Sequence, residues 1–361
     1  MRRTLFSVAI IGIGLAAGRF ETGDGIPPPP AEEMARRNDA LTRARVFVGG
    51  DFAPSRIDFG VDPNAEVVDR KLTSCKYKPD RSTGTTAKFD CVLKSGEKIK
   101  VKYGPTREIP SEIAGTRLMA ALGFAADRVS PVETVRCYGC PIQPFHTQAL
   151  IDMLGLSDWA AKRIDYSDYR DFENVSVERN FDGEAVEAGE DSGWAFFELK
   201  KIDPARGGAS RGEVDALRLM AIFLHHWDNK TSNQRLVCAD SKTADCAHPV
   251  VMIHDLGSEF GPKKVDLEKW KAQPIWTDAS TCTVSMKHMP YGGGTFEDVQ
   301  ISEEGRRLVG DRLKGLSRAQ TEQLFTVAQL DNVPQWTDVF QDKVRQIVER
   351  QPCPVIRKTS S

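Results

Sequence analysis

Residues that could perform chemistry gather between positions 226 and 257 of this 361-residue chain. The loop sequence HWDNKTSN contains Asp228, Lys230 and Asn233, and Asp255 follows two apolar runs joined by a short connection. One carboxylate can orient an attacking hydroxyl, an amide and a second carboxylate can hold Mg²⁺, and a lysine can neutralise developing charge. The pattern predicts metal-assisted phosphoryl transfer, with Asp228 as the base, Lys230 beside the transferred group, and Asn233 and Asp255 as metal ligands.

Two elements must position these side chains. Residues 213–226 (EVDALRLMAIFLHH) are apolar on nearly every side, which predicts a helix buried in a large core. The apolar runs that follow predict a hairpin that returns Asp255 to the loop. His225 and His226 do not form a metal site together, because adjacent residues of a helix face different sides. We group His226 with the catalytic residues and expect it to bond the backbone near Asp255.

The spacing of these residues resembles that of the protein kinase superfamily, whose catalytic loop reads H-x-D-x-K-x-x-N and whose metal-binding triplet is D-F-G. The four fixed positions of the loop are filled by His226, Asp228, Lys230 and Asn233. Asp255-Leu256-Gly257 takes the place of the triplet. The resemblance implies that the chain binds ATP with Mg²⁺ or Mn²⁺ and transfers a phosphoryl group.

Three departures point to the atypical members of this superfamily. Trp227 replaces the usual Arg and Leu256 the usual Phe, and the two acids lie 27 positions apart (255 − 228), farther than in ordinary protein kinases. HipA-like, phosphatidylinositol-kinase-like and secretory-pathway kinase-like proteins tolerate both substitutions. The chain is therefore similar to this atypical group. The missing Arg argues against activation by a phosphorylated loop that docks on it.

The rest of the chain alternates between strand-like and helix-like patterns. Antiparallel strands are predicted at 67–77, 85–93 and 97–104, a further strand at 126–139, and helices at 111–123, 306–316, 318–330 and 337–351. The fold class is α+β. The resemblance implies a two-lobed protein-kinase-like fold, with a small antiparallel β-sheet N-lobe that carries one helix and a mainly helical C-lobe.

The residues that the resemblance assigns to the nucleotide lie in this first sheet and its helix. They are Gly84, Thr85, Thr86, Lys88, Lys102 and Glu112. A glycine followed by small hydroxyl residues lets backbone N–H groups approach phosphate oxygens, as in a HipA-type phosphate loop. Lys102 would reach the phosphates, and Glu112, in the first turn of its helix, would orient Lys102. Glu108 replaces Glu112 if the register differs. Taken singly, the same residues also fit a hairpin turn, a solvated lysine and a carboxylate that complements the helix dipole.

We expect four parts along the chain. They are a signal peptide at 1–22, a Pro-rich linker and N-terminal helix at 23–60, a kinase-like N-lobe at 61–203 with an insertion at 141–193, and a kinase-like C-lobe at 204–361. Residues 193–199 (GWAFFEL) predict a buried strand. Residues 200–204 would link the lobes, where backbone groups could hold an adenine.

The N-terminus predicts export. Met1-Arg2-Arg3 precedes the apolar run TLFSVAIIGIGLAAG, which is short for a membrane span and typical of a secretory signal peptide. We expect a periplasmic or extracellular protein without a stable transmembrane span, or a membrane-anchored protein if the signal is not cleaved. Lys and Arg number 49 against 51 Asp and Glu, so no basic field predicts a nucleic-acid partner.

Eight cysteines in an oxidising compartment favour disulfides. Local pairing predicts the bonds Cys75–Cys91, Cys137–Cys140, Cys238–Cys246 and Cys282–Cys353. A zinc site is the alternative, in which Cys137 and Cys140 form a CxxC pair and Cys238, Cys246 and His248 complete the ligands.

Three functions stay open at this level. The first is an exported ATP- and Mg-dependent kinase that acts on the hydroxyl of a protein or a small molecule. The second is a catalytically inactive kinase-like binding or scaffold protein. The third is nucleotidyl transfer (AMPylation) on the same fold. The predicted partners are a nucleotide and, in the enzymatic cases, the acceptor.

Overall fold

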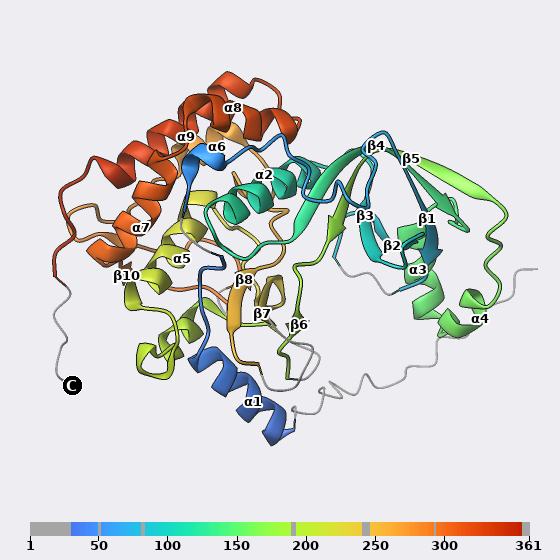
Figure 1. Ribbon diagram of the computed structural model, residues 1–361, viewed down its shortest axis with the longest axis horizontal. Coiled ribbons are helices and arrows are strands. Elements are labelled where there is room, and N and C mark those ends of the chain that lie inside the picture. The colour runs from blue at the N-terminus through green and yellow to red at the C-terminus, as the bar shows by residue number, and fades with distance from the viewer. Residues whose placement is uncertain are drawn as a thin grey trace, which may run out of the picture.

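The computed structural model describes residues 30–49, 52–80, 84–188, 193–239, 246–291 and 294–355. The chain is α+β, with a closed barrel of strands at one side of a mainly helical part (Figure 1). The predicted signal peptide and the first residues of the Pro-rich linker lie outside the described residues. Among the described residues, no helix combines the length and the apolar character needed to cross a membrane.

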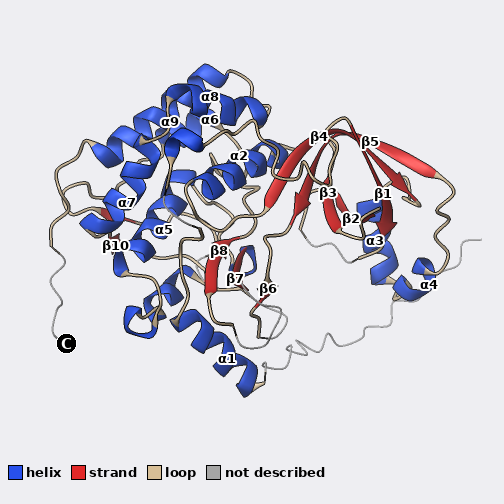
Figure 2. Cartoon of the chain, viewed as in Figure 1, coloured by secondary structure: helices blue, strands red, loops and turns tan. Residues whose placement is uncertain are grey.

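The barrel contains the four predicted strands and one more. Its strands are β1 (Leu72–Lys78), β2 (Lys88–Leu93), β3 (Lys98–Lys102), β4 (Arg128–Tyr138) and β5 (Tyr169–Arg179), in the order β1-β2-β3-β5-β4 (Figure 2). β1, β2 and β3 are antiparallel, as predicted. β1 and β4 are parallel and close the barrel, so the prediction of a purely antiparallel sheet is wrong at this pair.

Side-chain alternation explains how β3 serves both the barrel and the site. Ile99 and Val101 are buried in the apolar core of the barrel with Phe89 and Val177. Because successive residues of a strand face opposite sides, Lys102 projects outward from the barrel. It meets α2 (Glu108–Ala121) there.

β5 lies within residues 141–193, which the sequence analysis assigned to an insertion. It pairs with β3 and, over most of its length, with β4. Only residues 175–178 of β5 are buried. The rest of the strand is at least partly exposed and, apart from Tyr169 and Phe172, is charged or polar, so its sequence gives little sign of a strand. Between β4 and β5 the chain forms α3 (Pro144–Met153) and α4 (Ser157–Ala161), at the end of the barrel farthest from the helical part (Figure 1).

The helix α2 begins earlier than predicted. Pro110 lies in its first turn, where a missing N–H breaks no intrahelical hydrogen bond. Glu112 consequently lies in the second turn and not in the first. Most of α2 is buried against β4 and α8 (Arg318–Val327), and Gly123, with φ +84°, follows its end.

The predicted buried helix is α5 (Arg211–Leu224), at the centre of the helical part (Figure 2). Ser210 and Glu213 form a capping box at its start. The predicted C-terminal helices are confirmed as α7 (Glu303–Lys314), α8 and α9 (Val333–Val348). The shorter elements of this part are η1 (Pro54–Arg56), η3 (Pro204–Arg206), α6 (Leu267–Ala272), β9 (Thr283–Val284) and β10 (Val299–Gln300).

The strand predicted at 193–199 is wrong, because this segment runs into the 3₁₀ helix η2 (Phe196–Lys201). The Glu198 carboxylate accepts from the Ala195 N–H and pairs with Arg37 of α1 (Ala31–Thr42), which favours a helical turn over a strand. The link predicted at 200–204 is also misplaced. The chain leaves the barrel after β5, passes through residues 180–183, and forms β6 (Glu184–Ala185), which pairs with β7 (Gln234–Cys238).

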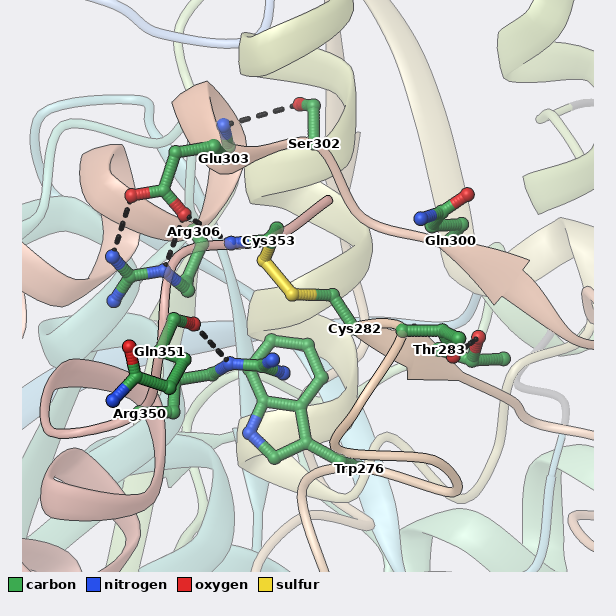
Figure 3. The surroundings of a disulfide bond; sticks show 12 residues. Trp276, Cys282, Thr283, Gln300, Ser302, Glu303, Arg306, Arg350, Gln351 and Cys353 are labelled. Carbon is green, nitrogen blue, oxygen red and sulfur yellow. Dashed lines mark hydrogen bonds and ion pairs between the residues drawn. A yellow bond between two sulfur atoms is a disulfide. The ribbon is translucent and has the colours of Figure 1, made fainter. Parts of the chain in front are cut away.

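All four predicted disulfides are present. They are Cys75–Cys91, Cys137–Cys140, Cys238–Cys246 and Cys282–Cys353. The zinc alternative is wrong, because each of its cysteines is bonded to another sulfur. Figure 3 shows how Cys282–Cys353 fastens the C-terminal segment beside β9, where the Cys353 N–H also donates to Glu303 at 2.8 Å.

Candidate functional site

The loop after α5 and the hairpin after it bring the predicted metal ligands together. Residues 226–233 end in the 3₁₀ turn η4 (Thr231–Asn233), which leads directly into β7. β7 pairs with β8 (Pro249–Ile253), with Gln234 opposite Ile253. The N–H groups of His254 and Asp255 donate to the Asn233 carbonyl at 2.8 and 3.2 Å. Asn233 and Asp255 therefore lie next to each other at the open end of the hairpin.

A polar cavity of about 380 Å³ opens between this hairpin and the barrel. Eight of the predicted site residues line it: Gly84, Thr85, Thr86, Lys88, Asp228, Lys230, Asn233 and Asp255. Glu108 lines it as well. The remaining three predicted residues, Lys102, Glu112 and His226, are buried and are not among its lining residues. Segments separated by more than 100 residues in the sequence thus meet around one space.

Lys102 and Glu112 form a buried ion pair behind the cavity. Lys102 Nζ is 2.5 Å from Glu112 Oε1 and 3.7 Å from Asp255 Oδ1. Burial alone would lower the pKa of Lys102, but Asp255, Glu112 and Glu178 raise it well above its usual value. Burial raises the pKa of Glu112, and the charge of Lys102 opposes this shift. Lys102 therefore stays charged between the carboxylates of Glu112 and Asp255.

The loop residues Asp228, Lys230 and Asn233 are held in complementary orientations. The Lys230 ammonium lies 3.1 Å from Asp228 Oδ2. The other oxygen, Asp228 Oδ1, is buried and has no hydrogen-bond partner in the described part of the chain. Asn233 Nδ2 donates to the Asp228 carbonyl at 2.7 Å, so the Asn233 Oδ1 oxygen is left to accept or to coordinate.

Asp255 has the character of a cation ligand. Burial alone would raise its pKa, but the charges of Lys102, His254 and Lys88 lower it well below the usual range, so it is ionised. Its Oδ1 accepts from the Gly257 N–H at 3.1 Å, and the side chain is 32 % exposed. Carboxylate and amide oxygens are the ligands that Mg²⁺ takes from proteins. Asp255 and Asn233 therefore fit a hard divalent cation.

His226 lies behind the cavity and not in its lining. Its ring is fully buried, with Nδ1 2.7 Å from Glu259 Oε1 and Nε2 3.0 Å from the side-chain amide of Gln234. The expected bond to the backbone is replaced by bonds to two side chains. Burial raises the pKa of Glu259, against the effect of His226. His226 positions the loop by tying it to Glu259 and to the start of β7.

The glycine loop contributes cations and donors to the barrel side of the cavity. Gly84 has φ +89°, a conformation that favours glycine. Lys88 begins β2 and lies opposite Lys102 in the sheet, and burial together with Lys102 lowers its pKa. Thr86 Oγ1 is buried without a hydrogen-bond partner among the described residues. Lys88 in the wall, Lys102 buried behind it and an unpaired hydroxyl make this side of the cavity suitable for a polyanion.

Sequence reasoning missed a second network beside the cavity. His254 Nδ1 lies 2.5 Å from Asp127 Oδ2, and the Phe181 N–H donates to Asp127 Oδ1 at 2.7 Å. Lys100 pairs with Glu178 at 2.8 Å, and its charge, with that of Lys102, lowers the pKa of Glu178 to about 2 although burial opposes the shift. These residues come from four separate segments, and no local pattern relates them. They fasten the segment after β5 to the hairpin.

An adjoining cavity of about 450 Å³ continues the site toward residues 180–183. It shares Asp90, Lys100 and Arg235 with the first cavity. The two cavities are neighbours: the first contains Asp255 in its lining, and the second contains residues 180–183, where the chain crosses after β5.

The chain was compared with known protein families, curated proteins and solved structures. No protein-family model matches the chain, and no curated protein matches it. Among solved structures, the chain is similar to the crystal structure of a Helicobacter pylori proinflammatory kinase, CtkA. The similar region covers 76% of this chain and 92% of that one, with 10% sequence identity and a TM-score of 0.41. A likeness this weak establishes no function, which must be inferred from the geometry of the cavity.

Proposed function

We propose that this protein is an ATP- and Mg²⁺-dependent phosphotransferase with a two-lobed, atypical kinase-like fold. The observation that carries the proposal is the convergence of Asp255, Asn233 and Asp228 with the Lys102–Glu112 pair around one polar cavity. Phosphoryl transfer depends almost entirely on positioning and on charge stabilisation, and this set of side chains supplies both.

In this proposal the nucleotide occupies both cavities. Lys88, Lys102 and the loop at Gly84 hold the phosphates, and the backbone groups of residues 180–183 hold the adenine. Asn233 and Asp255 hold Mg²⁺, which would neutralise charge on the phosphate oxygens. The adenine is thus placed at residues 180–183 and not at residues 200–204, where the sequence predicted it, because the chain leaves the barrel at residue 180.

The acceptor hydroxyl would meet Asp228. Its buried, unpaired Oδ1 can accept the hydroxyl proton, and Lys230, 3.1 Å from Oδ2, can neutralise charge on the transferred group. Tyr291 lies with its ring 5.8 Å from the Lys230 ammonium and also lines the cavity. We place the acceptor, the hydroxyl of a protein or a small molecule, between Asp228 and Tyr291.

We further propose that the protein is exported. Four disulfides, which join all eight cysteines, support this location, because such bonds persist in oxidising compartments. Cleavage of the apolar N-terminal run would release the protein, and retention of that run would anchor it to the membrane.

The test is label transfer from ATP by the purified, oxidised protein. With γ-labelled ATP and Mg²⁺ or Mn²⁺, the wild type should label itself or a candidate acceptor, and Asp228→Asn and Asp255→Asn should each abolish labelling. Asp338→Asn is the matched control and should keep activity, because Asp338 lies on α9 in an exposed ion pair with Arg318 of α8. Labelling from α-labelled ATP instead would indicate nucleotidyl transfer. No labelling and no thermal stabilisation by ATP with Mg²⁺ would indicate a scaffold.

A further inference from the structure

A third cavity lies in the helical part and shares no lining residue with the two cavities described above. Its volume is about 750 Å³, within the range typical of small-molecule sites. It opens between η2, α5 and the segment 295–299. Its apolar lining includes Phe196, Leu199, Ile202, Val214, Phe296 and Val299.

Arg218 of α5 also lines this cavity, one helical turn beyond Val214 and on the same face. The residue is 7 % exposed. Its guanidinium donates one hydrogen bond, from Nη1 to Asp215 Oδ1 at 3.0 Å. Arg218 Nε is buried without a partner in the part of the chain that the structure describes. A guanidinium carries five N–H donors, so Arg218 has donors left, Nε among them, for a ligand in the cavity.

The single buried carboxylate near Arg218 is shared with a second cation. Asp215 Oδ2 accepts from Arg211 Nε at 2.8 Å and from the Ser302 N–H at 3.0 Å. Asp215 is therefore fully engaged, and the cluster of Arg211, Asp215 and Arg218 has an excess positive charge. Burial lowers the pKa of Arg218 against the effect of Asp215, and Arg211 lowers it further.

The other charged lining residues do not cancel this excess. Lys287 and Asp298 pair with each other at 3.0 Å. Lys200 and Glu297 are exposed and have opposite charges. A buried cation with free donors at the edge of an apolar space is costly unless an anion compensates it.

We propose that this cavity binds a small organic anion, a carboxylate with an apolar chain or ring. Its carboxylate would lie at Arg218, and its apolar body would pack against Val214, Phe196 and Phe296. The proposal rests on the Arg211–Asp215–Arg218 cluster and is independent of phosphotransfer at Asp228.

The experiment compares three eight-carbon probes by calorimetry on the full-length, oxidised protein. Octanoate should bind, octanol should bind about tenfold more weakly or worse, and octylamine should not bind, because an interaction with a charged donor is worth at least that factor. Arg218→Gln should reduce octanoate binding by about tenfold or more. Val214→Trp, which fills the cavity and keeps Arg218, should abolish it. Arg307→Gln, an exposed arginine paired with Glu303, is the matched control.

Either of two results would overturn the proposal: octanoate that binds no better than octanol, or octanoate binding that survives both variants. The second result would place the probe on another surface, such as the exposed apolar residues Leu150, Met153 and Trp159 near α3 and α4. If Arg218→Gln does not fold, Val214→Trp and the comparison of the three probes still test whether the cavity binds an anion.

Discussion

At the scale of single residues, Lys102 is the side chain that connects the barrel to the cavity. It is 3 % exposed and lies between Glu112 of α2 and Asp255 after β8. An ammonium so deeply buried is stable only while its carboxylate partners remain. The same pair fixes where Lys102 can meet a phosphate, so stability and nucleotide binding depend on it together.

Substitution of Lys102 can separate its contribution to stability from its contribution to nucleotide binding. Lys102→Met should lower the free energy of unfolding by about 3–5 kcal/mol, because it leaves Glu112 buried without its cation. The double variant Lys102→Met/Glu112→Gln should recover part of that loss, since Glu112, the more deeply buried of the two carboxylate partners, is then neutral, while Asp255 is partly exposed. Neither variant should be stabilised by ATP with Mg²⁺. Urea unfolding and thermal shifts measure both quantities, and a double variant that responds to ATP like the wild type would contradict the role given to Lys102.

His225, at the end of α5, should make the fold sensitive to acid. Neither of its ring nitrogens has a hydrogen-bond partner among the described residues, and burial lowers its pKa from 6.5 to about 4, with smaller effects from His288 and Lys343. The unfolded chain therefore binds the proton first. The stability that neutral His225 provides is complete above pH 6.5 and is lost as the pH falls toward 4.

From this shift we expect the free energy of unfolding of the wild type to fall by about 2 kcal/mol when the pH is lowered from 7 to 5, through protonation of His225 in the unfolded chain. His225→Phe removes the titrating group. It should be less stable at pH 7, because φ is +58° at this position, yet it should lose about 2 kcal/mol less than the wild type on acidification. Urea unfolding at the two pH values is the measurement. Equal losses in both proteins would show that His225 does not titrate in this range.

At the scale of elements, the hairpin of β7 and β8 decides where Asp255 lies. Its register places Gln234 opposite Ile253, and a slip of one residue would turn Asp255 to the other face. The Cys238–Cys246 bond joins the end of β7 to the segment before β8, and the His254–Asp127 contact holds the open end of the hairpin. The hairpin is thus fixed at both ends.

Removing the Cys238–Cys246 bond should loosen the site as well as the fold. The double change Cys238→Ser/Cys246→Ser should cost about 2–3 kcal/mol of stability, as expected for a short loop, and should weaken the thermal shift produced by ATP with Mg²⁺. The matched control is Cys137→Ser/Cys140→Ser, which removes another short-range bond, in the barrel. That control should lower stability and leave the nucleotide-induced shift unchanged. Identical nucleotide responses in both variants would argue against coupling through the hairpin.

At the scale of the whole molecule, segments from both ends of the chain are built into the helical part. In α1, Arg37 pairs with Glu198 at 2.8 Å, and Arg45 continues beside β8 as a parallel bridge to Val250. At the other end, Cys353 is bonded to Cys282, and Arg350 stacks on Trp276 (Figure 3). Residues before the barrel and after the last helix thus stabilise the structure around α5.

The Cys282–Cys353 bond should be worth more to global stability than the other three. It closes a loop with a sequence separation of 71, against 3, 8 and 16 for the others. Chain entropy then predicts a loss of about 4 kcal/mol for Cys282→Ser/Cys353→Ser. Chemical unfolding of the four double-serine variants under oxidising conditions measures how much stability is lost with each disulfide. A smaller loss for this pair than for Cys137–Cys140 would contradict it.

The sequence by itself determined the features that neighbouring residues encode. The spacing of Asp228, Lys230 and Asn233 places them in one short loop, and strand periodicity directs Lys102 away from the barrel core. Three of the four disulfides join cysteines within 16 positions, where chain connectivity alone keeps them close. The long helix α5 was predictable because its apolar residues repeat over several turns.

Only the tertiary structure decided what depends on distant partners. β5 is a strand because β3 and β4 flank it, and few of its own residues are apolar. His226 is a positioning residue because Glu259, from beyond the hairpin, lies against it. The unbalanced charge at Arg218 appears once packing has buried it and given its single acid a second cation. Such properties arise from burial and from contacts across the fold, which no local pattern in the chain specifies.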